Sequence, residues 1–150
     1  IMAFQYNRIV VAVDGSKTAE AAFKKAVDIA LLNDNAKLFI VHVIDTSSAK
    51  MLDILYQNMY DLMHEHARVL LDSYKLMAEE AGIKEIETVA VKGSPRTILS
   101  KDLGTIADAD LIVCGKTGVG QIEHILIGST TEAIIHNAKC DVLIVNTPTE

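Results

Sequence analysis

The sequence predicts an α/β fold built on an open, five-stranded parallel sheet in the order 3-2-1-4-5, with helices on both faces. Short apolar runs rich in β-branched residues alternate along the chain with longer segments of helical periodicity. In three of the runs the apolar residues are nearly continuous and do not alternate with polar ones. This pattern is typical of strands that helices cover on both faces. Right-handed crossovers fold this β-α-β-α-β-α-β-α-β order into an open sheet.

The five expected strands are strand-length runs of mainly Val, Ile and Leu. They cover residues 9–13, 38–44, 87–91, 111–114 and 142–145. In an open sheet of this order, ligands bind beyond the carboxyl ends of the strands where the winding reverses, here between the first and fourth strands. The turn Asp14-Gly15-Ser16 and the turn at residues 115–118 are expected there.

Four helices are expected to connect the strands. In the first, apolar residues from Ala19 to Ala30 recur along one face, and Ser16 is the expected N-cap. The second is a long helix from about residue 51 to residue 81 that stops at Gly82.

The last two helices carry start signals in the sequence. Ser94-Pro95 supplies an N-cap and a first-turn proline for the third helix. Its apolar residues are Ile98, Leu99, Leu103 and Ile106. The fourth helix opens with Ser129-Thr130-Thr131-Glu132, a capping-box pattern that predicts Ser129 as the N-cap.

Length, charge and cysteine content restrict the class of protein. The chain has 150 residues, so residues 1–150 are expected to form a single domain. Its net charge of −6 offers no basic surface for nucleic acid. Cys114 and Cys140 lie among apolar residues and are expected to be reduced core residues. No apolar run approaches the roughly 20 residues of a membrane span, and we expect a cytoplasmic protein.

The most informative segment is rich in glycine and joins the fourth strand to the fourth helix. Gly115-Lys116-Thr117-Gly118 is followed by nine residues, 119–127, and then by Gly128-Ser129-Thr130. Glycine permits positive φ and lets main-chain N–H groups approach a ligand closely. A helix N-terminus adds unpaired donors and a partial positive charge. Together these features predict a phosphate-binding loop.

These residues resemble the ATP-binding branch of the universal stress protein family, whose signature is Gly, two residues, Gly, nine residues, Gly and then Ser or Thr. The chain fits this signature at Gly115, Gly118, Gly128 and Ser129. Further similar segments are Val13-Asp14, His42-Val43-Ile44-Asp45, Gly93-Ser94-Pro95 and residues 140–145. The resemblance covers nearly the whole chain and implies a Rossmann-like fold of the adenine nucleotide alpha hydrolase type.

The resemblance also implies an ATP at the switch point of the sheet, with Mg²⁺ or Mn²⁺ among its phosphates. Adenine would be read by the main chain of Val43 and by an apolar slot near Ala12 and Val13. Asp14 would lie by the adenine and ribose, and Gly115 would face the ribose. The phosphates would be held by Thr117, Gly118, Gly128, Ser129 and Thr130.

Three positions depart from the family pattern. A small residue or Ser is usual at Lys116, His or Arg is frequent at Thr117, and Pro is usual at Asp141. Lys116 either contacts phosphate or is solvated. The departure at Asp141 concerns only the last strand.

Several residues have a plainer interpretation beside the functional one. Ser129 caps the fourth helix if the capping box forms, and Asp14 caps the first helix in a similar way. Gly115-Lys116-Thr117 is not a P-loop, because the glycine required five residues earlier is Asp110.

The histidines give no clear catalytic pattern. His42 lies in an apolar strand and is interpreted as a hydrogen-bonded core imidazole, whereas His124 is the only histidine close to the proposed phosphates. His64 and His66 are two residues apart and point to different helix faces, so they do not match a zinc-protease motif.

The sequence favours nucleotide binding without turnover, because no nucleophile elbow, Cys-x-x-Cys or acid–base pair is visible. The expected function is regulatory: occupancy orders residues 119–127 and biases assembly or partner contact. The exposed edge at residues 142–145 would form a homodimer, as is common in the family. Two alternatives remain open, a slow ATPase or phosphoryl-transfer enzyme and a dimerisation module of the same fold that binds no nucleotide.

Overall fold

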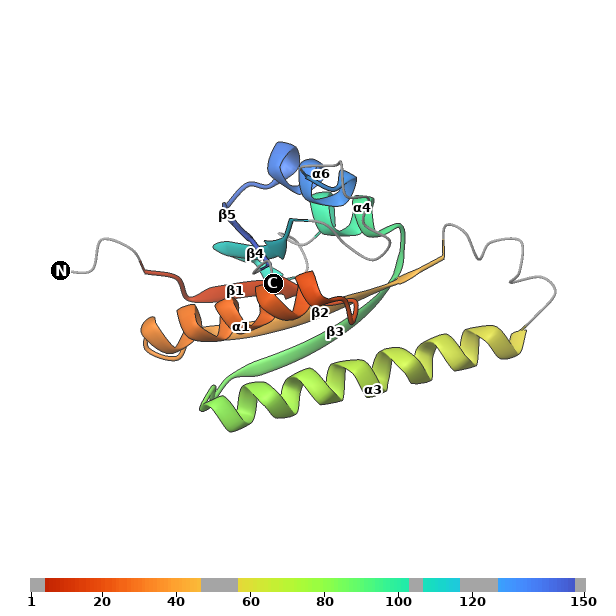
Figure 1. Cartoon of the computed structure of the whole chain (residues 1–150), viewed down its shortest axis with the longest axis horizontal. Helices are drawn as coiled ribbons and strands as arrows, with labels where there is room; N and C mark the ends of the chain where they lie inside the picture. The colour runs from red at the N-terminus through yellow and green to blue at the C-terminus, as the bar shows by residue number, and fades with distance from the viewer. Residues whose placement is uncertain (1–4, 47–56, 103–106, 117–126, 148–150) are drawn as a thin grey trace.

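The computed structural model describes residues 5–46, 57–102, 107–116 and 127–147. Five strands form one parallel sheet in the order β3-β2-β1-β4-β5 (Figure 1). Their bounds are β1 Arg8–Ala12, β2 Lys37–Asp45, β3 Ile86–Gly93, β4 Leu111–Gly115 and β5 Asp141–Val145. The predicted strands and their order are confirmed, with ends that differ by one or two residues.

Helices cover both faces of the sheet, as predicted (Figure 1). One face carries α1 (Lys17–Leu32) and α3 (Gln57–Ala81). The other carries α4 (Pro95–Thr97), the π-helical turn η1 (Ile98–Asp102) and α6 (Ser129–Asn137). Alternate residues of β1 enter the two cores, because successive side chains of a strand point to opposite faces. Ile9 and Val11 pack on the α1 side and Val10 on the α6 side.

α1 forms because small and medium-sized apolar residues recur at helical spacing. The buried residues include Ala22, Phe23 and Ala26. Ser16 is the N-cap, as predicted, and its hydroxyl accepts a hydrogen bond from the N–H of Ala19 at 3.2 Å. The cap therefore fixes where the chain leaves the β1 turn and enters the helix.

α3 is held to the sheet by one apolar face and ends at a glycine. Leu71 and Tyr74 are buried, and the ring of Tyr74 meets Phe23 of α1 edge-on with 4.8 Å between centroids. Gly82 follows the helix with φ of +104°, a conformation that favours glycine, so the predicted stop is confirmed. The part of the predicted helix at residues 51–56 lies outside the described residues.

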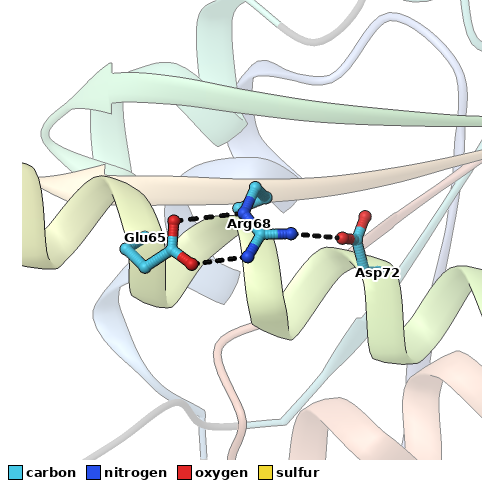
Figure 2. Close-up of polar contacts among 3 residues, drawn as sticks. All are labelled: Glu65, Arg68 and Asp72. Atoms are coloured by element: carbon cyan, nitrogen blue, oxygen red, sulfur yellow. Dashed lines mark hydrogen bonds and ion pairs between the residues drawn. The ribbon is translucent and has the colours of Figure 1, made fainter.

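The solvent-facing side of α3 carries a small ion-pair network. Arg68 lies between Glu65 and Asp72 and forms hydrogen-bonded ion pairs with both (Figure 2). The bonds from Arg68 lower the pKa of Glu65. Each of the three side chains is more than half exposed, so the network orders the helix surface and contributes little to stability.

The third predicted helix differs in form from the expectation. Pro95 opens α4 at the predicted place, but the side chain of Ser94 makes no capping bond. After three residues the helix widens into η1, where the buried Ser100 hydroxyl donates to the main-chain carbonyl of Arg96. A serine that bonds back to the preceding turn in this way is known to bend helices.

Some predicted residues lie outside the described part of the chain. They are Leu103 and Ile106 of the third helix, and Thr117, Gly118 and His124 of the glycine-rich segment. Among the described residues, no helix combines the length and the hydropathy that crossing a bilayer requires.

The two cysteines are free thiols, as predicted. Cys114 is buried near the end of β4, and Cys140 is half-buried before β5. Burial raises the pKa of the Cys114 thiol to about 11, so this residue stays protonated at neutral pH. Asp141, where the family usually has Pro, accepts a hydrogen bond from the Tyr6 hydroxyl at 2.8 Å and thereby joins the N-terminal segment to β5.

The packing of α3 on the sheet is tested by a pair of substitutions on that helix. Leu71 is 5% exposed and Val69 is 54% exposed. Leu71→Ala is expected to lower the free energy of unfolding by about 2–5 kcal/mol, because it leaves a cavity beneath the helix. Val69→Ala is the control and should change it by less than about 0.5 kcal/mol. Urea denaturation measures both, and equal losses would contradict the described packing.

Candidate functional site

The winding of the sheet reverses between β1 and β4, which are neighbours in its centre. From β1 the chain continues into α1 on one face, and the helix that follows β4, α6, packs on the other face. The carboxyl ends of β1 and β4 therefore lie between two diverging connections. Open α/β sheets bind their ligands at this position.

Two hydrogen bonds fix the start of α6 beside the end of β4. The N–H of Gly128 donates to the carbonyl of Lys116 at 2.8 Å, and the Thr131 hydroxyl donates to the carbonyl of Gly115 at 2.8 Å. Thr131 is buried, so its bond is protected from water. The residues that flank the 117–127 segment are thus held together, and the N-terminus of α6 is fixed at the carboxyl edge of the sheet.

Thr131 is a site residue that the sequence interpretation missed. The capping-box pattern suggested only that it occupies the first turn of the helix. Its partner, Gly115, lies 16 residues earlier in the chain, and no local sequence signal links the two. The residue therefore holds the site together without being a predicted ligand contact.

The predicted capping box at Ser129 is wrong, because the N-cap lies one residue earlier and Ser129 is the first residue of the helix. Gly128 is the N-cap, with φ −68° and ψ 158°, and its carbonyl accepts the first helical bond, from Glu132. Glu132 is thus one position too far along for a capping box, and its carboxylate lies 3.8 Å from Nε2 of His136. Ser129 lies exposed in the first turn, so helix capping does not explain its hydroxyl.

Gly115 is also required by a close contact within the protein. Among the described glycines, only Gly15, Gly82 and Gly93 have positive φ, so Gly115 and Gly128 do not use this freedom. A Cβ on Gly115 would lie 2.9 Å from the main-chain oxygen of Thr18, in the first turn of α1. The absence of a side chain at Gly115 therefore lets β4 and the start of α1 approach closely.

The turn after β1 is held by its own hydrogen bonds. The Asp14 carboxylate accepts the N–H of Ser16 at 2.9 Å, and Gly15 has φ of +83°. Because Ser16 is the N-cap of α1, the alternative that Asp14 caps this helix is wrong. Asp14 instead stabilises the turn that leads from the sheet to the helix, beside the end of β4 that Thr18 contacts.

The side chain, N–H and carbonyl of Val13 already make contacts within the protein. Its side chain is buried in the core beneath α1, whereas Ala12 is half-buried on the opposite side of the strand. The N–H of Val13 donates to the carbonyl of Val41 at 2.8 Å, and its own carbonyl lies 2.7 Å from Nδ1 of His42. The prediction that His42 is a hydrogen-bonded imidazole is confirmed.

The main chain of Val43 is directed toward the switch point. In β2, main-chain groups of Lys37 and Val41 form hydrogen bonds with the chain of β1 and its flanks. The main-chain groups of alternate residues in a strand point to the same neighbouring strand. Val43 therefore directs its N–H and carbonyl to that side, beyond the last bond between the two strands, which joins Val13 and Val41.

Lys116 is half-buried directly after β4.

The described site is thus composed of amide groups, hydroxyls, the Asp14 carboxylate and one lysine around the ends of three strands. Among the described residues, no group of three or more His, Cys, Asp or Glu is arranged to hold a metal ion. Such a set of donors suits an anionic ligand with polar groups at both ends.

Comparison with known proteins identifies the family. A sequence profile described as the universal stress protein family matches residues 5–146. A universal stress protein of Staphylococcus saprophyticus is 44% identical over 142 residues, which are 95% of this chain and 84% of the relative.

Solved structures share the fold. A universal stress protein from Lactobacillus plantarum has a TM-score of 0.85 at 28% identity, over 95% of this chain and 99% of that chain. A universal stress protein in complex with cAMP has a TM-score of 0.71 at 30% identity, over 97% and 100%. A third, from Archaeoglobus fulgidus in complex with dAMP, has a TM-score of 0.61 at 26% identity, over 95% and 98%. The chain therefore belongs to the universal stress protein family.

Proposed function

We propose that this protein binds ATP at the carboxyl ends of β1, β2 and β4 and acts as a nucleotide-dependent regulatory protein of the stress response. The observation that carries the proposal is the N-terminus of α6, which is fixed beside the end of β4 by the bonds of Gly128 and Thr131. The complexes of two related proteins with cAMP and dAMP support an adenine nucleotide as the ligand. The glycine spacing resembles the signature of the ATP-binding branch of the family, and this resemblance favours a triphosphate.

The phosphates are assigned to the start of α6. The N–H groups of Ser129, Thr130 and Thr131 have no partner within the helix and carry its partial positive charge. The exposed Ser129 hydroxyl adds a donor, and Lys116 adds a positive charge from the end of β4. Thr117, Gly118 and Gly128 complete this end of the proposed site, as the resemblance implies.

The adenosine end is assigned to the ends of β1 and β2. Val43 would read the adenine through its N–H and carbonyl, next to an apolar slot at Ala12. Asp14 and Gly115 would lie by the ribose. Val13 would position its neighbours rather than contact the base, because its N–H, carbonyl and side chain are already in use.

A divalent ion, Mg²⁺ or Mn²⁺, would lie among the phosphates. Mg²⁺ bound with nucleotides takes most of its ligands from phosphate oxygens and water rather than from a protein cage. The hydroxyls of Ser129 and Thr130 suit such an ion as protein oxygen ligands, and the ion would neutralise part of the phosphate charge.

The phosphate assignment is tested by placing a negative charge at the start of α6. Ser129→Glu should leave the melting temperature of the free protein unchanged or higher, because acidic residues favour a helix N-terminus. It should remove the shift caused by ATP and Mg²⁺, because the carboxylate repels phosphate. For wild type, ATP at about 100 times its dissociation constant adds roughly 2.7 kcal/mol, which is several degrees for a chain of this size. Ser73→Glu on the exposed side of α3 is the control, and an equal ATP shift in all three proteins would refute the assignment.

The bound nucleotide is proposed to be a regulatory ligand rather than a substrate. The assigned phosphate contacts are hydroxyls, amides and a lysine, which hold charge without activating water. In a single-turnover assay with labelled ATP and Mg²⁺, the nucleotide should be recovered intact after hours. Release of ADP from the bound pool would favour the slow ATPase instead.

We also propose that the protein is a cytoplasmic homodimer that pairs through β5. β5 is an edge strand whose residues Val142, Leu143 and Ile144 are half-exposed. Ile144→Lys should convert a dimer into a monomer in light-scattering measurements, and Ala90→Lys on the opposite edge strand, β3, should leave the dimer intact. A wild-type monomer, or a dimer that persists in a folded Ile144→Lys variant, would argue against this interface.

A further inference from the structure

Two histidines from different elements approach each other near the exit of β1. His42 belongs to β2 and His66 to α3, and these two elements pack together. The ring centroids are 6.5 Å apart, and the ring planes are inclined by 72°. Neither residue is assigned a contact with the nucleotide in the proposed function.

The ring of His42 is oriented by a hydrogen bond from Nδ1, which leaves Nε2 as the nitrogen that can bind a metal ion. Its Nδ1 lies 2.7 Å from the main-chain oxygen of Val13. A carbonyl oxygen can only accept a hydrogen bond, so Nδ1 carries the hydrogen and Nε2 of the neutral ring keeps its lone pair. Histidines that bind metal ions are oriented in this way, by donating the other ring N–H to a carbonyl or carboxylate.

His66 is placed where it can share an ion with His42. It is exposed on α3, and Leu70, one turn later, packs 3.7 Å from the position of a Cβ on Gly15, so this part of the helix lies against the β1–α1 turn. Two imidazoles that bind one tetrahedral Zn²⁺ at about 2.0–2.1 Å have ring centroids roughly 5–5.5 Å apart. The observed separation of 6.5 Å is about 1 Å longer, so the exposed His66 side chain would have to rotate toward His42 to share an ion.

The geometry points to a binding site for a late first-row divalent metal ion, such as Zn²⁺, between His42 and His66. Imidazole nitrogen suits zinc, copper and nickel. Among the described residues, no third His, Cys, Asp or Glu completes a cluster with the pair, so water or an external ligand fills the remaining positions. The net charge of −6 favours the approach of a cation.

The test is a calorimetric titration of the metal-free, nucleotide-free full chain with Zn²⁺. The chain has five histidines, and His136 has an acidic neighbour one turn away, so all proteins carry His124→Gln and His136→Gln. This background should bind one Zn²⁺. Adding His66→Gln should weaken binding at least about 10-fold, since loss of groups that merely orient metal ligands weakens it by about 10–100-fold. Adding His64→Gln, an exposed histidine two residues away, should change nothing.

Imidazole NMR on the same background protein gives a second readout. Before metal is added, His42 should carry its hydrogen on Nδ1, and Zn²⁺ should shift the signals of Nε2 of His42 and one ring nitrogen of His66. The site is refuted if the background protein binds no Zn²⁺, if His66→Gln binds as tightly as the background, or if His64→Gln causes the same loss. No nucleotide is present, so failure here leaves the proposed ATP site untouched.

Discussion

The close approach of β4 to the first turn of α1 sets the geometry of the carboxyl edge. A Cβ at Gly115 would lie 2.9 Å from the main-chain oxygen of Thr18, so β4 and α1 meet at this distance only because the residue is glycine. On the other side of the same residue, the Gly115 carbonyl accepts the Thr131 hydroxyl. One residue thus joins the starts of α1 and α6, and both helix N-termini are brought to the end of a central strand.

This junction explains why a site can form without specialised catalytic side chains. The groups gathered there are mainly main-chain amides and small hydroxyls, whose positions follow from strand and helix ends. The turn at Asp14 is fixed from two directions, by its own bond to Ser16 and by the contact of His42 with Val13. Positions determined by the backbone in this way require little reorganisation when a ligand binds.

Much of the fold could be predicted from the sequence, because its signals are local. The apolar runs predicted the strands, Ser16 predicted the start of α1, and Gly82 predicted the end of α3. The N-cap of α6 could not be placed to the residue, because the Ser-x-x-Glu pattern is present whether the N-cap is Ser129 or Gly128. The bond from Gly128 to Lys116 accompanies the earlier N-cap, and it is a tertiary contact. The π-helical turn η1 could not be predicted either, because it accompanies a hydrogen bond of the buried Ser100 hydroxyl.

The candidate site also contains some residues that the sequence predicts and others that it does not. The glycine spacing predicts where a ligand binds, but it does not reveal the internal contact that also requires glycine at Gly115, because Thr18 is far away in sequence. Thr131 and the pairing of His42 with His66 depend on contacts between elements and carry no local signal. Residues that hold a site in place are therefore harder to find from sequence than residues that line it.

The most direct test of the central claim is an amide NMR titration of the isotope-labelled protein with ATP and Mg²⁺. The account predicts that the largest shifts occur together at Val43, Gly115, Ser129 and Thr130, which come from three separate elements that meet at the carboxyl edge. Shifts confined to α3, or none at saturating nucleotide, would contradict it.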